Sequence, residues 1–165
     1  MEAYLQGNQD DLSTRARLMT HYFQHAIAQP RVAHVLWVIE HHPGSKLAGS
    51  PVASVTRADL LNTRSDYEAA RLLWLKQTEV HPRDAAVLAN AGRFFREEEP
   101  RRAEQFLIRA WQLEPENKMR RAALVSFYTQ VVADCEFRPQ APANPRACLD
   151  SAWIQEVKSR LTGQP

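Results

Sequence analysis

Apolar and polar positions alternate along most of the chain with the period of an α-helix. Between residues 10 and 28, Leu12, Ala16, Met19 and Phe23 recur at spacings of three and four, so they share one helical face. Similar patterns occur at 31–42, 66–80, 83–97, 100–114, 117–134 and 145–161. No segment shows a clear strand pattern. The sequence therefore predicts an all-α protein of about seven helices.

Residues at the ends of these segments are typical of helix boundaries. Asp10 or Asp11, Asp66 and Asn117 stand where a side chain accepts hydrogen bonds from the first turn of a helix. Pro145 suits the first turn of the last helix, where its missing N–H has no cost. Other prolines and glycines are predicted to separate helices: Pro30, Pro43, Gly44 and Pro82.

One connection, residues 43–64, lacks this periodicity. It is rich in Gly, Ser and Pro at its start, and only 56–62, "TRADLLN", suggests a short helical turn. Irregular connections of this length are uncommon inside a compact domain and are often functional. The segment could cover a groove or serve as a docking strand for a partner, and the sequence leaves both open.

Residues 83–116 have the pattern of a repeated helical hairpin. Leu88, Ala91, Gly92 and Phe95 mark its first helix, and the second carries Ala103, Leu107, Ala110 and then Pro115. This arrangement resembles the tetratricopeptide repeat (TPR), in which small residues allow close helix packing and larger ones fill the space beside them. Pro82 and Pro115 are 33 positions apart, close to the roughly 34-residue period of the family.

The resemblance implies a single TPR-like domain over residues 1–165, built as an α–α superhelix. Its four units are expected at 10–43 (degenerate), 44–82 (broken), 83–116 (regular) and 117–162 (extended by a proline-rich loop). Neighbouring repeats stack because no single hairpin can bury its apolar side alone.

The family binds peptides or proteins on a concave wall formed by the first helix of each unit. The resemblance therefore implies a non-enzymatic interaction module, or scaffold, with a peptide or protein partner. The residues expected on this wall are Asn90, Arg93, Arg96, Ala122, Ser126, Thr129, Arg17 and Thr20. The family's carboxylate clamp is not expected, because only Asn90 matches it and Met119 and Ala123 occupy positions that need basic residues. Alternatively, the arginines pair with acidic neighbours on a solvated face.

Composition and charge further narrow the class of protein to which the chain can belong. The chain has 165 residues, 44% hydrophobic and 24% charged, with a net charge of +2, which by itself does not predict binding to nucleic acid or membranes. No apolar run approaches the roughly 20 residues of a membrane-spanning helix, and no secretory signal is recognised. Few glycines with many Arg and Ala suggest a bacterial origin.

The two cysteines, Cys135 and Cys148, bracket a proline-rich segment. They are either a disulfide that pins this segment or two free thiols in a reducing cytosol. The protein is therefore expected to be cytoplasmic or, if the cysteines are paired and a signal peptide has been removed, periplasmic or exported.

Three other functions have weaker support in the sequence. His21 and His25 are four positions apart and could chelate Zn or Ni, but no third ligand is evident, so no metal or other cofactor is predicted. No catalytic residue is predicted, because no phosphate-binding loop, GxSxG or CxxC motif is present. RNA binding could use the basic stretch 118–123, yet no base-reading pair recurs between units. Weak self-association through an uncapped end also remains open.

Overall fold

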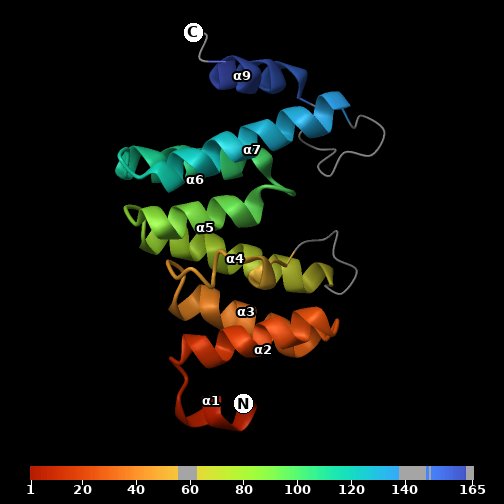
Figure 1. Ribbon diagram of the computed structural model, residues 1–165, viewed down its shortest axis with the longest axis vertical. Helices are drawn as coiled ribbons and strands as arrows, with labels where there is room; N and C mark the ends of the chain where they lie inside the picture. The colour runs from red at the N-terminus through yellow and green to blue at the C-terminus, as the bar shows by residue number, and fades with distance from the viewer. Residues whose placement is uncertain (56–62, 138–147, 149, 163–165) are drawn as a thin grey trace. The chain divides into compact units, whose positions relative to one another are not determined.

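The computed structural model describes residues 1–55, 63–137, 148 and 150–162. These residues form eight α-helices and one short 3-10 helix, with no strand among them, so the all-α prediction is confirmed. The chain divides into two compact units, Met1–Pro82 and Arg83–Pro165. Figure 1 labels the helices in chain order.

The first unit contains four α-helices and the 3-10 helix. They are α1 (Glu2–Gly7), α2 (Leu12–Gln24), α3 (Ala28–His41), η1 (Pro51–Ala53) and α4 (Arg64–Val80). Helix α3 packs against both α2 and α4, while α1 and η1 pack against α2. The deeply buried apolar side chains of this unit include Met19, Val35, Val38, Ile39, Tyr67 and Trp74. The unit is thus organised around α3.

The second unit contains α5 (Ala85–Phe95), α6 (Pro100–Leu113), α7 (Lys118–Phe137) and α9 (Ser151–Thr162). Each of these helices packs against the next one along the chain. Helices α5 and α6 approach closely at Gly92, where a Cβ atom would lie 2.7 Å from Cγ of Leu107. Ala91, Ala103 and Ala110 are also buried, so small side chains line this helix pair as the sequence predicts.

A buried carboxylate joins three helices of the second unit. Glu104 of α6 accepts hydrogen bonds from the Tyr128 hydroxyl of α7 at 2.8 Å and from Nε1 of Trp153 on α9 at 2.7 Å. Arg160 of α9 also donates to it. Burial and the hydrogen bond to Glu104 raise the pKa of Tyr128 to about 12, so the phenol keeps its proton at neutral pH.

Several helix boundaries differ from the predicted ones. The cap of α4 is Thr63 rather than Asp66, because Thr63 Oγ1 accepts from the Asp66 N–H while Oδ2 of Asp66 accepts from the Thr63 N–H. Pro30 does not separate two helices, because α3 already begins at Ala28. A proline in the first turn is tolerated because the N–H it lacks has no partner within the helix.

Two further differences lie at the ends of the chain. Helix α1 was not expected from the sequence. The last helix begins at Ser151, where Oδ1 of Asp150 accepts from the Trp153 N–H at 3.0 Å; Pro145 lies outside the described residues. Two predicted caps agree with the structure: Asp11 accepts from the Thr14 N–H, and Asn117 from the Met119 N–H.

The first part of the irregular connection packs into the first unit. Arg31 of α3 is completely buried and donates hydrogen bonds to the carbonyl oxygens of Val52 and Ser54, at 3.2 and 2.8 Å. Ala53 and Val55 are buried beside them. A buried arginine therefore holds this backbone in place. The expected helical turn at 56–62 lies outside the described residues.

Candidate functional site

Three arginines from the α5 and α7 region of the second unit influence one another's charge. Arg93 lies in the last turn of α5, Arg96 follows it as the C-terminal cap, and Arg120 is in the first turn of α7. The pKa of Arg93 is lowered, first by partial desolvation of its guanidinium and then by the positive charges of Arg120 and Arg96. Because the positive charges of Arg96 and Arg120 both act on Arg93, we group the three residues and call them the arginine cluster.

The three guanidinium groups of the arginine cluster have different partners. Arg93 donates to Oδ1 of Asn90 at 3.1 Å, and Arg96 donates to Oε1 of Gln130. Arg120 donates to Oε2 of Glu114 at 2.9 Å. Within the described part of the chain, Arg93 has no carboxylate partner. A guanidinium in this situation favours a carboxylate or another oxyanion from outside the chain, which it binds through two parallel hydrogen bonds.

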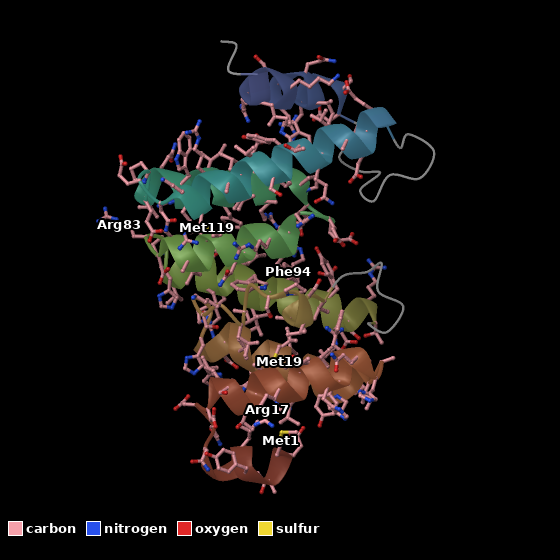
Figure 2. The ribbon with its side chains drawn as sticks, in the orientation of Figure 1. Met1, Arg17, Met19, Arg83, Phe94 and Met119 are labelled. Atoms are coloured by element: carbon pink, nitrogen blue, oxygen red, sulfur yellow. A yellow bond between two sulfur atoms is a disulfide. The ribbon has the colours of Figure 1, made fainter. Side chains whose placement is uncertain are left out.

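The exposed face of α7 continues from this cluster. Ala122, Ser126 and Thr129 are exposed and follow one another at spacings of four and three. The larger apolar residues Met119 and Val125 are also exposed, at 68% and 45%; Figure 2 labels Met119 at the start of α7. Small side chains leave the helix surface open to close approach, and the two larger ones offer apolar area to a partner.

The eight residues predicted from the sequence divide between the two units. Five of them lie on α5 and α7, and a sixth, Arg96, caps the end of α5 and donates a hydrogen bond to Gln130 of α7. Arg17 and Thr20 belong to α2 in the other unit (Figure 2 labels Arg17), where the Thr20 hydroxyl donates to the Ala16 carbonyl. Asn90 is buried, with its amide oxygen accepting from Arg93, so it supports the cluster from beneath.

Sequence reasoning did not identify Arg120, Gln130 or Glu114 as part of this site. Arg120 could have been found, because it lies three positions after the predicted cap Asn117 and thus in the first turn of α7. Gln130 carries no such signal. Its role follows only from the packing of α7 beside α5.

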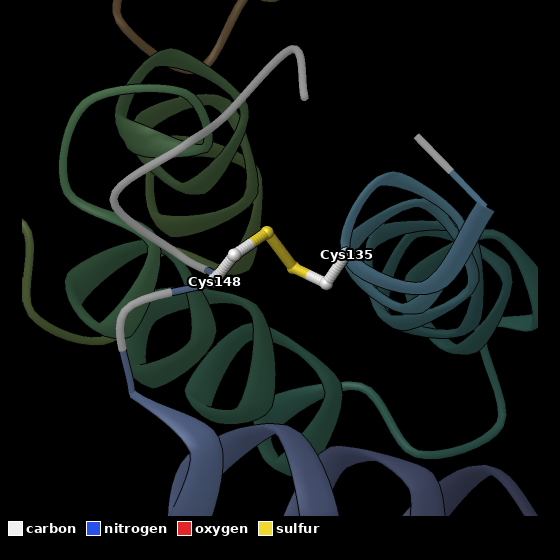
Figure 3. Close-up of a disulfide and its surroundings, with 2 residues drawn as sticks. All are labelled: Cys135 and Cys148. Carbon is white, nitrogen blue, oxygen red and sulfur yellow. A yellow bond between two sulfur atoms is a disulfide. The ribbon is translucent and has the colours of Figure 1, made fainter. Parts of the chain in front are cut away.

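The two cysteines form a disulfide in the structure (Figure 3). Cys135 lies near the end of α7 and Cys148 shortly before α9, with their Cα atoms 5.3 Å apart. Both residues are partly exposed. The bond ties the start of α9 to α7 in addition to the contacts around Glu104.

The histidines do not gather into one site. His34 is 8% exposed and lies between Arg15, whose Nη1 is 2.8 Å from its Nδ1, and Glu2, whose Oε1 is 3.0 Å from its Nε2. His42 contacts Asp10, and His21 lies beside His25. Within the described residues, no three His, Cys, Asp or Glu side chains are arranged to hold a metal ion.

An open depression of about 470 Å³ lies at the starts of α6 and α9. Its lining includes Arg101, Arg102 and Trp153. Arg101 pairs with Asp150 and Arg102 with Glu99. Each of these two guanidinium groups has a carboxylate partner, whereas Arg93 has none among the described residues.

The described helices include none long and apolar enough to cross a membrane. No protein-family model, curated protein sequence or solved structure matches the chain. The resemblance to the tetratricopeptide repeat therefore depends on the residue pattern described above.

Proposed function

We propose that this chain is a TPR-like helical repeat protein, arranged as a solenoid, that works without catalysis as a protein–protein interaction module. The residue pattern of 83–116, the spacing of Pro82 and Pro115 and the close packing of α5 on α6 at Gly92 support this proposal. Such repeats present extended surfaces for binding, and our proposal assigns this role to α5 and α7, as the first helices of two consecutive units.

The proposed binding surface is the arginine cluster together with the exposed face of α7. The observation that carries the proposal is the position of Arg93, which is repelled by two other arginines and has no carboxylate partner in the described chain. An acidic segment of a protein partner would relieve this repulsion. Met119 and Val125 would then cover apolar side chains of the same segment.

The test is a binding experiment with a matched charge reversal. The protein, carrying a photo-crosslinking side chain at exposed Thr129, is incubated with its native cell extract and the crosslinked partner is identified and purified. Binding of that partner is then measured for wild type, for Arg93→Glu with Arg96→Glu, and for Arg83→Glu with Arg109→Glu. The last two variants change the net charge equally, and both control positions are exposed in the same unit.

The cluster variant is expected to bind the partner about tenfold more weakly or worse, while the control variant binds like wild type. Wild-type binding should also weaken as salt rises, because exposed charges are screened. Equal binding by the two variants would contradict the proposal. Crosslinking only to RNA would replace the protein partner with a nucleic acid.

A further inference from the structure

A pair of exposed histidines lies at the C-terminal end of α2 in the first unit. His21 lies in the last turn and His25 is the residue that caps the helix. Their rings are 4.3 Å apart between centroids and inclined by 38°. Two imidazoles that share one ion at metal–nitrogen distances of about 2.0–2.1 Å have centroids roughly 4.5–5 Å apart, which is close to the separation of these two rings.

The hydrogen bonding of His25 selects the nitrogen that is left for a ligand. Its Nδ1 lies 2.9 Å from the carbonyl oxygen of His21, and a carbonyl only accepts, so Nδ1 carries the proton. The lone pair then resides on Nε2, the outer nitrogen of the ring. A backbone carbonyl that fixes the tautomer and orientation of a histidine in this way is the usual second partner of metal-binding imidazoles.

The end of α2 also favours a cation. The last carbonyl groups of a helix carry a partial negative charge, and both histidines lie at this end. Arg17, one turn earlier on the same face, opposes a positive ion. It is exposed, however, and its long side chain is free to extend into solvent away from the pair.

We propose that His21 and His25 form a two-histidine site for a transition-metal dication such as Ni²⁺ or Zn²⁺. Imidazole nitrogens select these ions over Mg²⁺ and Ca²⁺, which prefer oxygen ligands. Since no third His, Cys, Asp or Glu of the described chain joins the pair, water completes the coordination. This site belongs to the first unit and is independent of the arginine cluster.

The other histidines of the first unit are less suited to this role. His34 is buried between Arg15 and Glu2. His41 stacks on the ring of Trp37 at 4.5 Å, and His42 contacts Asp10. His81 is exposed at the end of α4 with no second imidazole in the described chain beside it. It therefore provides a matched control.

The experiment is isothermal titration of the full-length, tag-free chain with ZnCl₂, NiCl₂ and MgCl₂ at pH 7.5. Wild type and His81→Asn are expected to bind one Zn²⁺ or Ni²⁺ ion with the same affinity and to give no heat with Mg²⁺. His21→Asn and His25→Asn should each bind about tenfold more weakly or not at all. All three positions are at the surface, so circular dichroism should show the same fold for every variant.

NMR of the wild-type chain gives a second readout. Substoichiometric Ni²⁺ should broaden the ring signals of His21 and His25 before those of any other histidine, and acidification should reverse the effect because protons compete for the nitrogen lone pairs. The proposal is overturned if wild type gives no heat with either transition metal, if His21→Asn and His25→Asn bind like His81→Asn, or if another histidine is broadened first.

Discussion

At the scale of single residues, two buried charges, Glu104 and Arg15, each have several partners. Glu104 accepts from Tyr128, Trp153 and Arg160. Arg15 donates to His34 and to the Gln9 carbonyl, and its guanidinium lies 3.5 Å from the centre of the Trp37 ring. Removing one partner of a buried charge costs several kcal/mol. These side chains therefore fix the positions of the helices that they join.

Glu2 makes the attachment of α1 sensitive to acid. Its carboxylate accepts from the Tyr22 hydroxyl at 2.5 Å and contacts His34, and these two hydrogen bonds lower its pKa below the ordinary 4.5. A carboxyl group whose pKa is lowered by folding stabilises the folded state fully above its ordinary pKa, and this contribution is lost as pH falls through the lowered value. We expect α1 to loosen in a transition centred below pH 4.5.

The chemical shift of the buried Leu5 amide, followed by NMR from pH 7 to pH 3, measures this transition. Glu2→Gln keeps an acceptor oxygen but has no charge to lose, so its Leu5 signal should not change below pH 4.5. The explanation fails if the wild-type signal stays constant over this range or if the variant shows the same transition.

At the scale of elements, the closeness of α5 and α6 depends on Gly92. A Cβ at this position would lie 2.7 and 2.9 Å from Cγ and Cδ2 of Leu107 and 3.2 Å from the Ala103 carbonyl oxygen. Gly92→Ala gains about 1 kcal/mol in helix propensity, but overpacking of a tight core costs about 1–3 kcal/mol. We expect a net loss of about 1 kcal/mol in the free energy of unfolding, measured by urea denaturation.

Gly7→Ala is the control for this substitution, because no atom lies within 4 Å of its added Cβ. It should leave the free energy of unfolding unchanged or raise it slightly, because Gly7 is the last residue of α1 and its replacement by Ala can only add helix propensity. A Gly92→Ala protein as stable as wild type would show that α6 moves away from α5 at little cost.

The sequence predicted most helices because their apolar faces have a clear period, but it located their ends less well. Thr63 and Asp66 cap α4 together, and either residue alone matches the cap signal. The prediction that Pro30 separates two helices was wrong, because a proline can also occupy the first turn of a helix. Helix α1 has only six residues, and its position depends on Tyr22 and His34, which are distant in the sequence. Such tertiary contacts override local propensity.

At the scale of the whole molecule, the sequence predicted two members of the arginine cluster and missed what surrounds them. The positions of Arg93 and Arg96 could be predicted from the helical period of α5. Arg120 and Gln130 come from another helix, and only the packing of α7 in the second unit brings them near. The sequence also did not predict the burial of Asn90 beneath Arg93, because an amide side chain is more often exposed. Spacing along one helix is readable from sequence, whereas pairing between helices is not.

The disulfide should stabilise one unit of the molecule and leave the stability of the other unchanged. Cys135 and Cys148 both belong to Arg83–Pro165, and they are 13 positions apart. Closing a loop of this size stabilises a fold by about 3 kcal/mol, chiefly by restricting the unfolded chain. Reduction should therefore lower the stability of residues 83–165 while α9 stays attached through Glu104. Residues 1–82 contain neither cysteine, so reduction should not change their stability.

Hydrogen–deuterium exchange with and without a dithiol reductant measures both units in one sample. Exchange should accelerate in α7 and α9 on reduction and stay the same in α2, α3 and α4. The double variant Cys135→Ser with Cys148→Ser should exchange like the reduced protein, and the reductant should not change its exchange. If reduction accelerates exchange equally in both units, they unfold as one cooperative body; if it changes neither, the bond adds no stability. A stabilising disulfide would in turn favour an oxidising compartment, where such bonds persist.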